Sequence, residues 1–185
     1  MGADDPGKPA FARTRTALTP LPVSSVIDTL VHPNGLVRNV LLSGPVSLAG
    51  TTHVAGGREA LVEEMARDNR VILYGEDIAD YGGAFKLTKG LMEAFGRRRV
   101  FNTPISEACI CGTAVGAGIV GLRPVIELMY MDFALMSSDQ IANQAAKWHY
   151  MSGGQVEVPV VYRCSVGAGK GYGGQHSQSL ESLFT

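Results

Sequence analysis

Residues 99–133 read RVFNTPISEACICGTAVGAGIVGLRPVIELMYMDF, and this stretch decides the fold of the chain. Its pattern predicts a strand, a tight loop, a helix over residues 107–120, a short turn and a second strand over residues 125–129. Ser106 is a natural N-cap, so Glu107 falls in the first turn of the predicted helix. We therefore expect any chemistry of the chain to be centred on Glu107.

Short apolar runs and helix-like segments alternate on both sides of this stretch. A short apolar run is typical of a strand that is buried on both faces. Alternation at this spacing predicts an α/β fold with a mainly parallel sheet and helices on both faces. The predicted strands are residues 71–74, 100–102, 125–129 and 158–162, and the predicted helices are residues 58–67, 86–95, 107–120 and 137–151.

The first 54 residues differ in composition from the rest. They contain many of the prolines and show no sustained helical period. Residues 23–31 and 36–42 could each be a short strand or one helical turn, and the pattern leaves both alternatives open. We expect residues 1–54 to be a poorly ordered N-terminal extension and residues 55–185 to be the domain. A transit peptide is an alternative that early arginines favour and early aspartates disfavour.

Composition excludes several classes of function. Apolar residues make up 45% and charged residues 18% of the chain, which is typical of a globular domain. The formal net charge of -1 argues against nucleic acid or an anionic membrane surface as a partner. No apolar run is long enough to span a bilayer. Three cysteines without C-x-x-C spacing favour neither a disulfide framework nor a zinc site. We expect a reducing compartment, the cytoplasm or, in a eukaryote, the mitochondrial matrix.

Two glycine-rich motifs resemble nucleotide-binding signatures, but their context argues against both. Residues 116–121 satisfy G-x-G-x-x-G. That motif binds a pyrophosphate where a strand precedes it and a helix begins with it, whereas here the glycines end a helix. Residues 167–171 hint at a P-loop, yet Cys164 replaces the first glycine of that motif. Gly171 stands where a Ser or Thr would bind magnesium.

Candidate functional side chains follow several of the predicted strands. Glu76 comes just after one strand, at the sheet edge where ligands bind in open α/β folds. Phe133 follows another, and His176 lies beyond a glycine-rich loop. Each residue also has a structural explanation, because Glu107 could simply favour the helix dipole. Phe133 could belong to the core, and His176 could be a loop histidine.

In combination, these features resemble a known family: the β subunit of the thiamine-diphosphate-dependent E1 component of 2-oxo acid dehydrogenase complexes. Pyruvate, branched-chain and acetoin dehydrogenase β chains are all similar at this level. The resemblance runs from Arg58 to the C-terminus and leaves residues 1–54 outside. The matching blocks are REALVEEMARD, GEDIADYGGAFKLTKGL, NTPISEACICGTAVGAGIVGLRP, MDF, DQIANQAAKWHYMSGG, VPVVYR and GGQHSQS.

The resemblance implies a transketolase-like pyrimidine-binding domain and assigns roles to its residues. Glu107, in the PISE-type motif, would bond N1′ of the cofactor's aminopyrimidine and promote the imino tautomer, whose 4′-nitrogen can take the proton from thiazolium C2. Phe133 would stack on the aminopyrimidine, and Glu76 and Ile105 would complete the cofactor site. His176 would assist acyl transfer to the lipoyl group of E2.

The resemblance also implies partners and ions. An E1 α subunit would hold Mg²⁺ and the diphosphate in an α2β2 heterotetramer, because the GDG…N-type motif is absent from this sequence. In some members a backbone carbonyl, here that of Val160, helps to bind a structural K⁺. The expected reaction is oxidative decarboxylation of a 2-oxo acid, pyruvate in the first place, followed by acyl transfer to lipoyl-E2.

The family pattern continues beyond Thr185, so we expect a domain that is C-terminally incomplete. An isolated chain of this kind is expected to be inactive. The alternative to a catalytic subunit is therefore a non-catalytic truncated fragment or an interaction module.

Overall fold

The computed structural model of the chain describes residues 25–31, 37–43, 50–167 and 171–184, with side chains described from residue 57 onward. Within these residues the fold is a six-stranded sheet in the order β2-β1-β6-β5-β3-β4. Four neighbouring strands run parallel and two are antiparallel additions at one edge. The strands are β1 (Ser25–Val31), β2 (Val37–Ser43), β3 (Val71–Gly75), β4 (Val100–Asn102), β5 (Arg123–Leu128) and β6 (Val161–Ser165).

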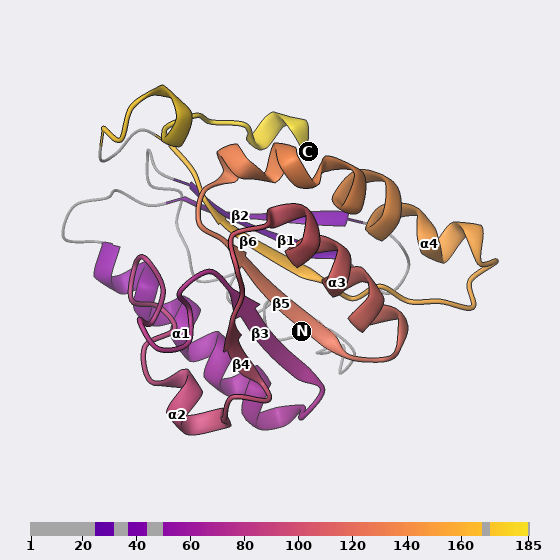
Figure 1. The fold of residues 1–185 in the computed structure, drawn as a ribbon, viewed down its shortest axis with the longest axis horizontal. Helices are drawn as coiled ribbons and strands as arrows, with labels where there is room; N and C mark the ends of the chain where they lie inside the picture. The colour runs from indigo at the N-terminus through magenta and orange to yellow at the C-terminus, as the bar shows by residue number, and fades with distance from the viewer. Residues whose placement is uncertain (1–24, 32–36, 44–49, 168–170, 185) are drawn as a thin grey trace, which may run out of the picture.

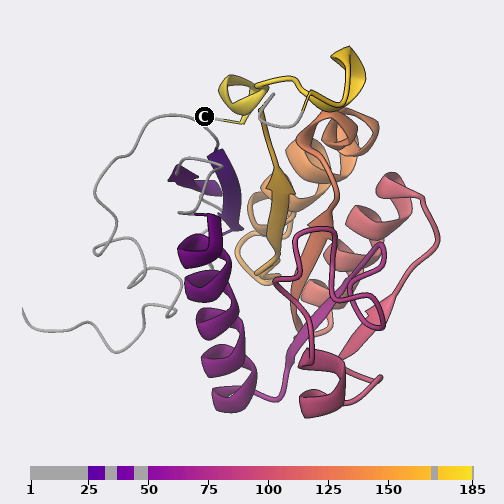
Figure 2. The same ribbon diagram turned by 90° about the vertical axis from the view of Figure 1, so that its left-hand side faces the viewer.

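Helices cover both faces of this sheet. The helix α1 (Gly50–Arg67) lies on one face, and α3 (Glu107–Ile119) and α4 (Ala146–Met151) lie on the other (Figures 1 and 2). The short α2 (Leu91–Phe95) contacts the edge strand β4. The predicted fold class, a mainly parallel sheet with helices on both faces, is therefore confirmed.

Of the two alternatives for residues 23–31 and 36–42, a short strand or a helical turn, the structure shows strands, β1 and β2. They form an antiparallel pair, and β1 also pairs antiparallel with β6. Residues 50–54 of the predicted extension begin α1, and its residues 1–24, 32–36 and 44–49 lie outside the described residues. The poorly ordered extension, the domain boundary near residue 55 and the transit-peptide alternative therefore stay predictions.

The helix predicted over residues 86–95 is wrong in its first half. Only α2 is helical, because Lys86 and Gly90 have φ values of +62° and +81°, in the left-handed region that an α-helix does not contain. The buried Thr88 hydroxyl donates a hydrogen bond to the carbonyl oxygen of Ile78 at 2.6 Å. This contact folds the segment back onto the loop that follows β3.

Two further elements differ from their prediction near the end of the domain. The helix predicted over residues 137–151 is divided into a π-helical segment, Asp139–Ala145, and α4, after a 3-10 segment, Met131–Ser137. The strand predicted at residues 158–162 begins later, as β6. Pro159 has no N–H to donate, and the N–H of Val160 bonds to the carbonyl of Val158 at 2.9 Å, so neither joins a ladder.

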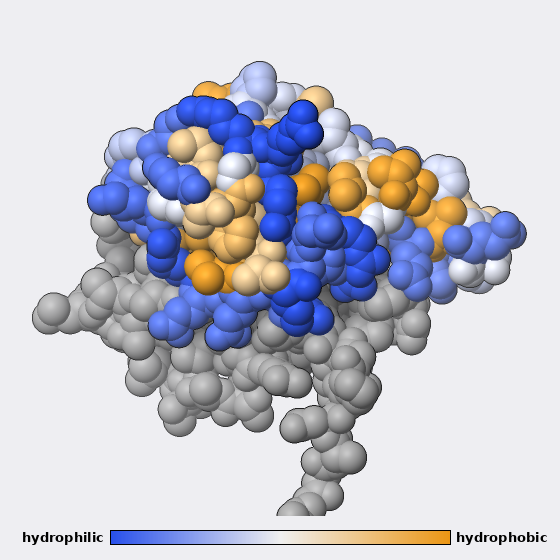
Figure 3. All heavy atoms as spheres, turned by 90° about the horizontal axis from the view of Figure 1, so that it is seen from below, coloured by the Kyte–Doolittle hydropathy of each residue, from blue (hydrophilic) through white to orange (hydrophobic). Residues whose placement is uncertain are grey.

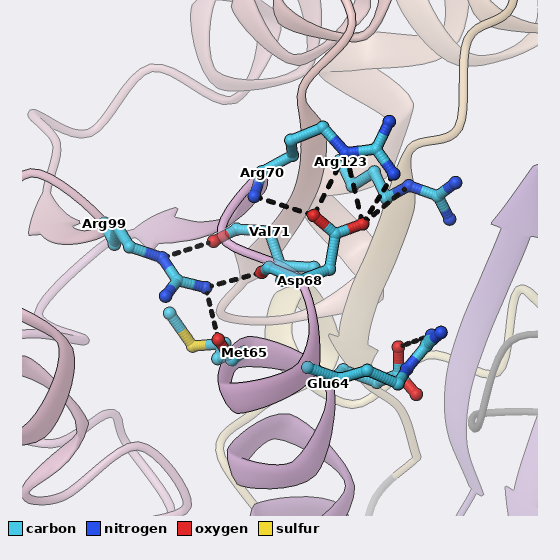
Figure 4. A network of polar contacts seen from close by, with 8 residues as sticks. Glu64, Met65, Asp68, Arg70, Val71, Arg99 and Arg123 are labelled. Carbon is cyan, nitrogen blue, oxygen red and sulfur yellow. Dashed lines mark hydrogen bonds and ion pairs between the residues drawn. The ribbon is translucent and has the colours of Figure 1, made fainter.

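Arginines fasten the end of α1 to the sheet (Figure 4). The Arg99 guanidinium donates to the carbonyl oxygens of Met65, Asp68 and Val71 at 2.8, 2.9 and 3.0 Å. Such carbonyls at a helix C-terminus have no partner within the helix. The Asp68 carboxylate accepts hydrogen bonds from Arg70, which lower the pKa of Asp68 to about 2, and Arg123 pairs with it at 3.2 Å.

The surface mixes hydrophilic and hydrophobic side chains. On the face shown in Figure 3, two hydrophobic areas are separated by hydrophilic residues. Among the residues that the structure describes, we find no helix with the length and hydrophobicity needed to cross a membrane.

Candidate functional site

The candidate site lies at the carboxyl ends of the parallel strands. Glu76 follows β3, and the loop after β4 leads to Glu107 at the start of α3. The segment Met131–Ser137 follows β5, and the turn Gly174–His176 comes after β6. Figure 1 shows this last turn beside the chain that leaves β5. The topology therefore gathers residues from four strand ends at one edge, where open α/β sheets bind ligands.

Glu107 occupies the predicted position in the first turn of α3. Its side chain is buried, with 5% of the residue exposed. Ser106 is the N-cap residue by position and its carbonyl accepts the N–H of Ile110 at 2.9 Å. The predicted N-cap position is therefore confirmed, although no hydrogen bond from the Ser106 side chain caps the helix within the described residues. The first N–H groups of α3 therefore lie at the site without that partner.

Glu76 lies close enough to Glu107 for the two carboxylates to interact. Burial, with smaller contributions from the charges of Glu107 and Asp77, raises the pKa of Glu76. Its Oε1 is buried and has no hydrogen-bond partner among the described residues. A buried carboxyl oxygen without a donor is costly to the folded state. The pair therefore suits a ligand that brings hydrogen-bond donors into the site.

Phe133 and His176 come together from different loops. Their ring centroids are 5.0 Å apart with an interplanar angle of 76°, an edge-to-face contact. Tyr130 makes similar contacts with His176 at 5.4 Å and with Tyr172 at 5.8 Å. Phe85 reaches Tyr130 at 6.4 Å. These five rings form an aromatic cluster from the loops at the same edge of the sheet as the carboxylate pair, and we refer to them as the ring cluster.

Sequence reasoning missed three members of the ring cluster: Phe85, Tyr130 and Tyr172. Tyr130 could have been found, because it lies just after β5, three residues before Phe133. Phe85 and Tyr172 lie in irregular segments, where no periodicity points to a common surface.

Asp132 is a further residue that sequence reasoning missed. It is 6% exposed, and its Oδ1 accepts the N–H of Gln178 at 3.1 Å. Its Oδ2 is buried without a hydrogen-bond partner in the described part of the chain. The signal was present as a single acidic residue in the apolar run that surrounds Phe133. A carboxylate in such a run is rarely buried without a specific partner.

A largely buried ion pair joins the two strands, β5 and β6, that lead into the site. Glu127 on β5 and Arg163 on β6 are directly opposite in the parallel register, and their side chains are 12% and 9% exposed. Arg163 donates to Glu127 Oε2. The pair therefore joins the two strands, β5 and β6, whose following segments carry Phe133 and His176.

The remaining two predicted site residues are in different positions. Ile105 is 80% exposed on the loop before α3. Val160 is buried, but it precedes β6 and so lies at the opposite edge of the sheet from Glu107. Side-chain ligands for a metal are not grouped anywhere in the described residues. The role of Ile105 and the potassium site at Val160 stay predictions.

Comparison with known proteins agrees with the geometry. Residues 51–185 match the family model of the transketolase pyrimidine-binding domain. Over 128 residues the chain is 49% identical to the pyruvate dehydrogenase E1 component subunit beta of Rickettsia bellii, which covers 69% of this chain and 39% of the relative. It is 50% identical over 127 residues to the chloroplastic subunit beta-3 of Oryza sativa, covering 69% of this chain and 32% of the relative.

A longer match includes part of the N-terminal region. The mitochondrial pyruvate dehydrogenase E1 subunit beta of Saccharomyces cerevisiae is 43% identical over 167 residues, covering 82% of this chain and 46% of the relative. The chain thus spans less than half the length of these three relatives. The resemblance to E1 β subunits that the motifs indicate is confirmed. The chain belongs to the transketolase pyrimidine-binding domain family, in the part of it that pyruvate dehydrogenase E1 β subunits represent.

Proposed function

We propose that the chain provides the aminopyrimidine-binding half of a thiamine-diphosphate-dependent E1 component that decarboxylates a 2-oxo acid oxidatively. The observation that carries the proposal is the buried carboxylate pair, Glu107 and Glu76, at the carboxyl edge of the sheet. The relatives are pyruvate dehydrogenase subunits by name, which favours pyruvate as the substrate.

The residues present fit the pyrimidine end of the cofactor. An aminopyrimidine has ring nitrogens and an exocyclic amino group, and Glu76 Oε1 is a buried acceptor without a donor among the described residues. Glu107 would hold N1′, and the half-buried ring of Phe133 would present a flat apolar face to the heterocycle. When bound, thiamine diphosphate supplies an electron sink for the electrons released on decarboxylation.

The protein's contribution to the reaction is control of one proton. Burial, with a smaller contribution from the charge of Glu107, raises the pKa of Glu76, so a full second negative charge at the pair is disfavoured. Glu107, shielded from water, would then share a proton with N1′ of the aminopyrimidine within hydrogen-bond reach. His176 would act later, as the group that assists acyl transfer. The ring cluster holds it at the same edge.

Partners complete the proposed function. An E1 α subunit would bind the diphosphate and Mg²⁺ in an α2β2 assembly, and a lipoyl-bearing E2 would accept the acyl group. A structural K⁺ at the carbonyl of Val160 belongs to the same proposal. The compartment, cytoplasm or mitochondrial matrix, stays a prediction. The relatives include a mitochondrial and a chloroplastic protein.

The test replaces Glu107 by Gln and uses Glu93→Gln, on the exposed surface of α2, as the matched control. Each chain is assembled with an E1 α subunit, and exchange of the C2 proton of bound thiamine diphosphate is followed in deuterated water. Glu107→Gln is expected to slow exchange by roughly 10²–10⁴-fold, the range for loss of a positioned acid–base group. The control is expected to exchange like the wild type.

Two results would count against the proposal. Unchanged exchange in Glu107→Gln removes the assigned role of Glu107. Failure of the wild-type chain to co-elute with the α subunit in size-exclusion chromatography, with no thiamine diphosphate retained, favours the non-catalytic fragment or interaction module instead.

A further inference from the structure

One side chain makes a hydrogen bond between the loops that follow β5 and β6. Asp132 lies after β5, and its Oδ1 accepts the N–H of Gln178, which is 46 residues later in the chain, at 3.1 Å. The carbonyl of Gln178 in turn accepts the N–H of Gly167 at 3.1 Å. Both backbone groups of Gln178 are therefore fixed, one by each loop. Of these two hydrogen bonds, the one to Asp132 connects the loop after β6 to the loop after β5.

This attachment point lies two residues from His176. The turn Gly174–His176 is only three residues long, and the N–H of His176 bonds to the carbonyl of Gly173 at 3.2 Å. The ring of His176 is placed by edge-to-face contacts with Phe133 and Tyr130. Because such ring contacts are weak, the position of the imidazole depends on where the backbone of its turn is held.

The burial of Asp132 is difficult to explain by stability alone. One of its carboxylate oxygens has a single backbone donor and the other, Oδ2, has none among the described residues. Ser177 Oγ, on the segment that Asp132 holds, is also buried without a partner in this part of the chain. A buried polar group with so few donors costs free energy, whereas an apolar residue at this position would not. The placement therefore indicates a role in the site.

We propose that Asp132 is the positioning residue for His176. Through its hydrogen bond to Gln178, the Asp132 carboxylate fixes the turn Gly174–His176. That turn then positions the imidazole beside Phe133, at the carboxyl edge of the sheet. This inference rests on the proposed function, and in particular on the assistance of His176 in acyl transfer.

In reductive acylation the lipoyl S–S bond breaks and one sulfur forms a bond to the acyl carbon. The other sulfur leaves as a thiolate and takes a proton. The two electrons would come from the decarboxylated substrate, whose acyl group is transferred to the first sulfur. Proton delivery to the departing sulfur requires an imidazole within hydrogen-bond reach, so a displaced turn slows this step selectively.

The experiment compares Asp132→Ala, Asp132→Asn, His176→Ala and the double variant Asp132→Ala/His176→Ala in the assembled complex. Two rates are measured: acylation of an isolated E2 lipoyl domain, and reduction of an artificial electron acceptor that bypasses acylation. Asp132→Ala is expected to lower the ratio of the first rate to the second by about 10-fold or more. Asp132→Asn keeps the acceptor oxygen and is expected to restore most of the ratio. Asp139→Ala, on the exposed π-helical segment, is the control for a removed carboxylate.

Non-additivity separates positioning from a structural effect. If Asp132 acts through His176, the double variant has the ratio of His176→Ala alone. Multiplied losses in the double variant, a ratio equal to the wild type in Asp132→Ala, or no rescue by Asn would each overturn the inference.

A second readout does not depend on activity. Amide hydrogen exchange of the chain is expected to be faster at Gln178 in Asp132→Ala than in the wild type, and near the wild-type rate in Asp132→Asn. Equal exchange in Asp132→Ala and the wild type would contradict the inference. If the wild-type complex shows no thiamine-dependent activity, the proposed function fails while this readout still tests the contact.

Discussion

Gly75 is the position at which the smallest side-chain addition is expected to do the most damage. It ends β3 and lies directly opposite Glu127 on β5. A Cβ at this residue would be 2.4 Å from the carbonyl oxygen of Glu127, and 3.2 Å from both the carbonyl carbon and the nitrogen of that residue. All three atoms belong to the backbone, so no rotamer change can relieve the contact. Gly75→Ala therefore has to separate two central strands of the sheet.

The magnitude follows from that separation. Bringing the contact to 3.0 Å requires the strands to move apart by about 0.6 Å, which weakens the neighbouring ladder hydrogen bonds. Overpacking of this kind costs roughly 1–3 kcal/mol, and the entropy that alanine removes from the unfolded chain returns about 0.4–1 kcal/mol. We expect a cost near the upper end of this range, because the atoms that the new Cβ meets belong to the backbone of Glu127 and cannot rotate away. We expect Gly75→Ala to lower the free energy of unfolding by about 2 kcal/mol, or roughly 4–8 °C in Tm.

Gly116→Ala provides the matched control. Gly116 is exposed in the middle of α3, and a Cβ there would meet nothing within 4 Å. The same substitution is therefore expected to raise the free energy of unfolding by about 0.5–1 kcal/mol through helix propensity. Both variants are measured by thermal and urea unfolding of the chain, followed by circular dichroism. A Gly75→Ala variant within about 0.5 kcal/mol of the wild type would refute the reasoning about the strand contact.

Two further predictions concern charged side chains. The folded-state pKa of Glu76 is raised, chiefly by burial, so its contribution to stability is present below its unfolded pKa and is lost as the pH rises through the folded one. Glu76→Gln should therefore be more stable than the wild type at pH 7, with the difference disappearing at acid pH; urea unfolding across pH measures this, and a less stable variant at pH 7 would contradict it. Arg99→Ala should lower the free energy of unfolding by about 2 kcal/mol, because three carbonyl oxygens lose a charged donor. Exposed Arg98→Ala is its control, and equal stabilities of the two variants would refute the argument.

Local pattern was sufficient for much of the fold. The apolar run of β3 and the N-cap serine before α3 are encoded within a few residues, so the positions of these elements and of Glu107 could be predicted. The helix predicted over residues 86–95 failed because its first half adopts left-handed φ at Lys86, a conformation that no periodicity reports. For residues 23–31 the pattern could not choose between strand and helical turn, because the choice depends on pairing with β6.

The same distinction between local and long-range signals explains which residues of the candidate site could be predicted. Glu107, Glu76, Phe133 and His176 were found from their places after predicted strands and from motif resemblance. Asp132 was not, because its partner is the backbone of Gln178, 46 residues away. A backbone N–H has no sequence signature, so a side chain that serves it is invisible until the fold brings the two segments together.

The pairing of β1 with β6 has a consequence for how the chain folds. It joins Val26 to Ser165, a separation of about 140 positions, and contacts of such range are slow to form. Synthesis therefore exposes β1 and β2 long before their partner strand exists. Until they dock, β6 presents a row of unsatisfied N–H and C=O groups, on which a second nascent copy could pair. The docking of the antiparallel pair β1–β2 onto β6 is thus the late folding step that competes with aggregation.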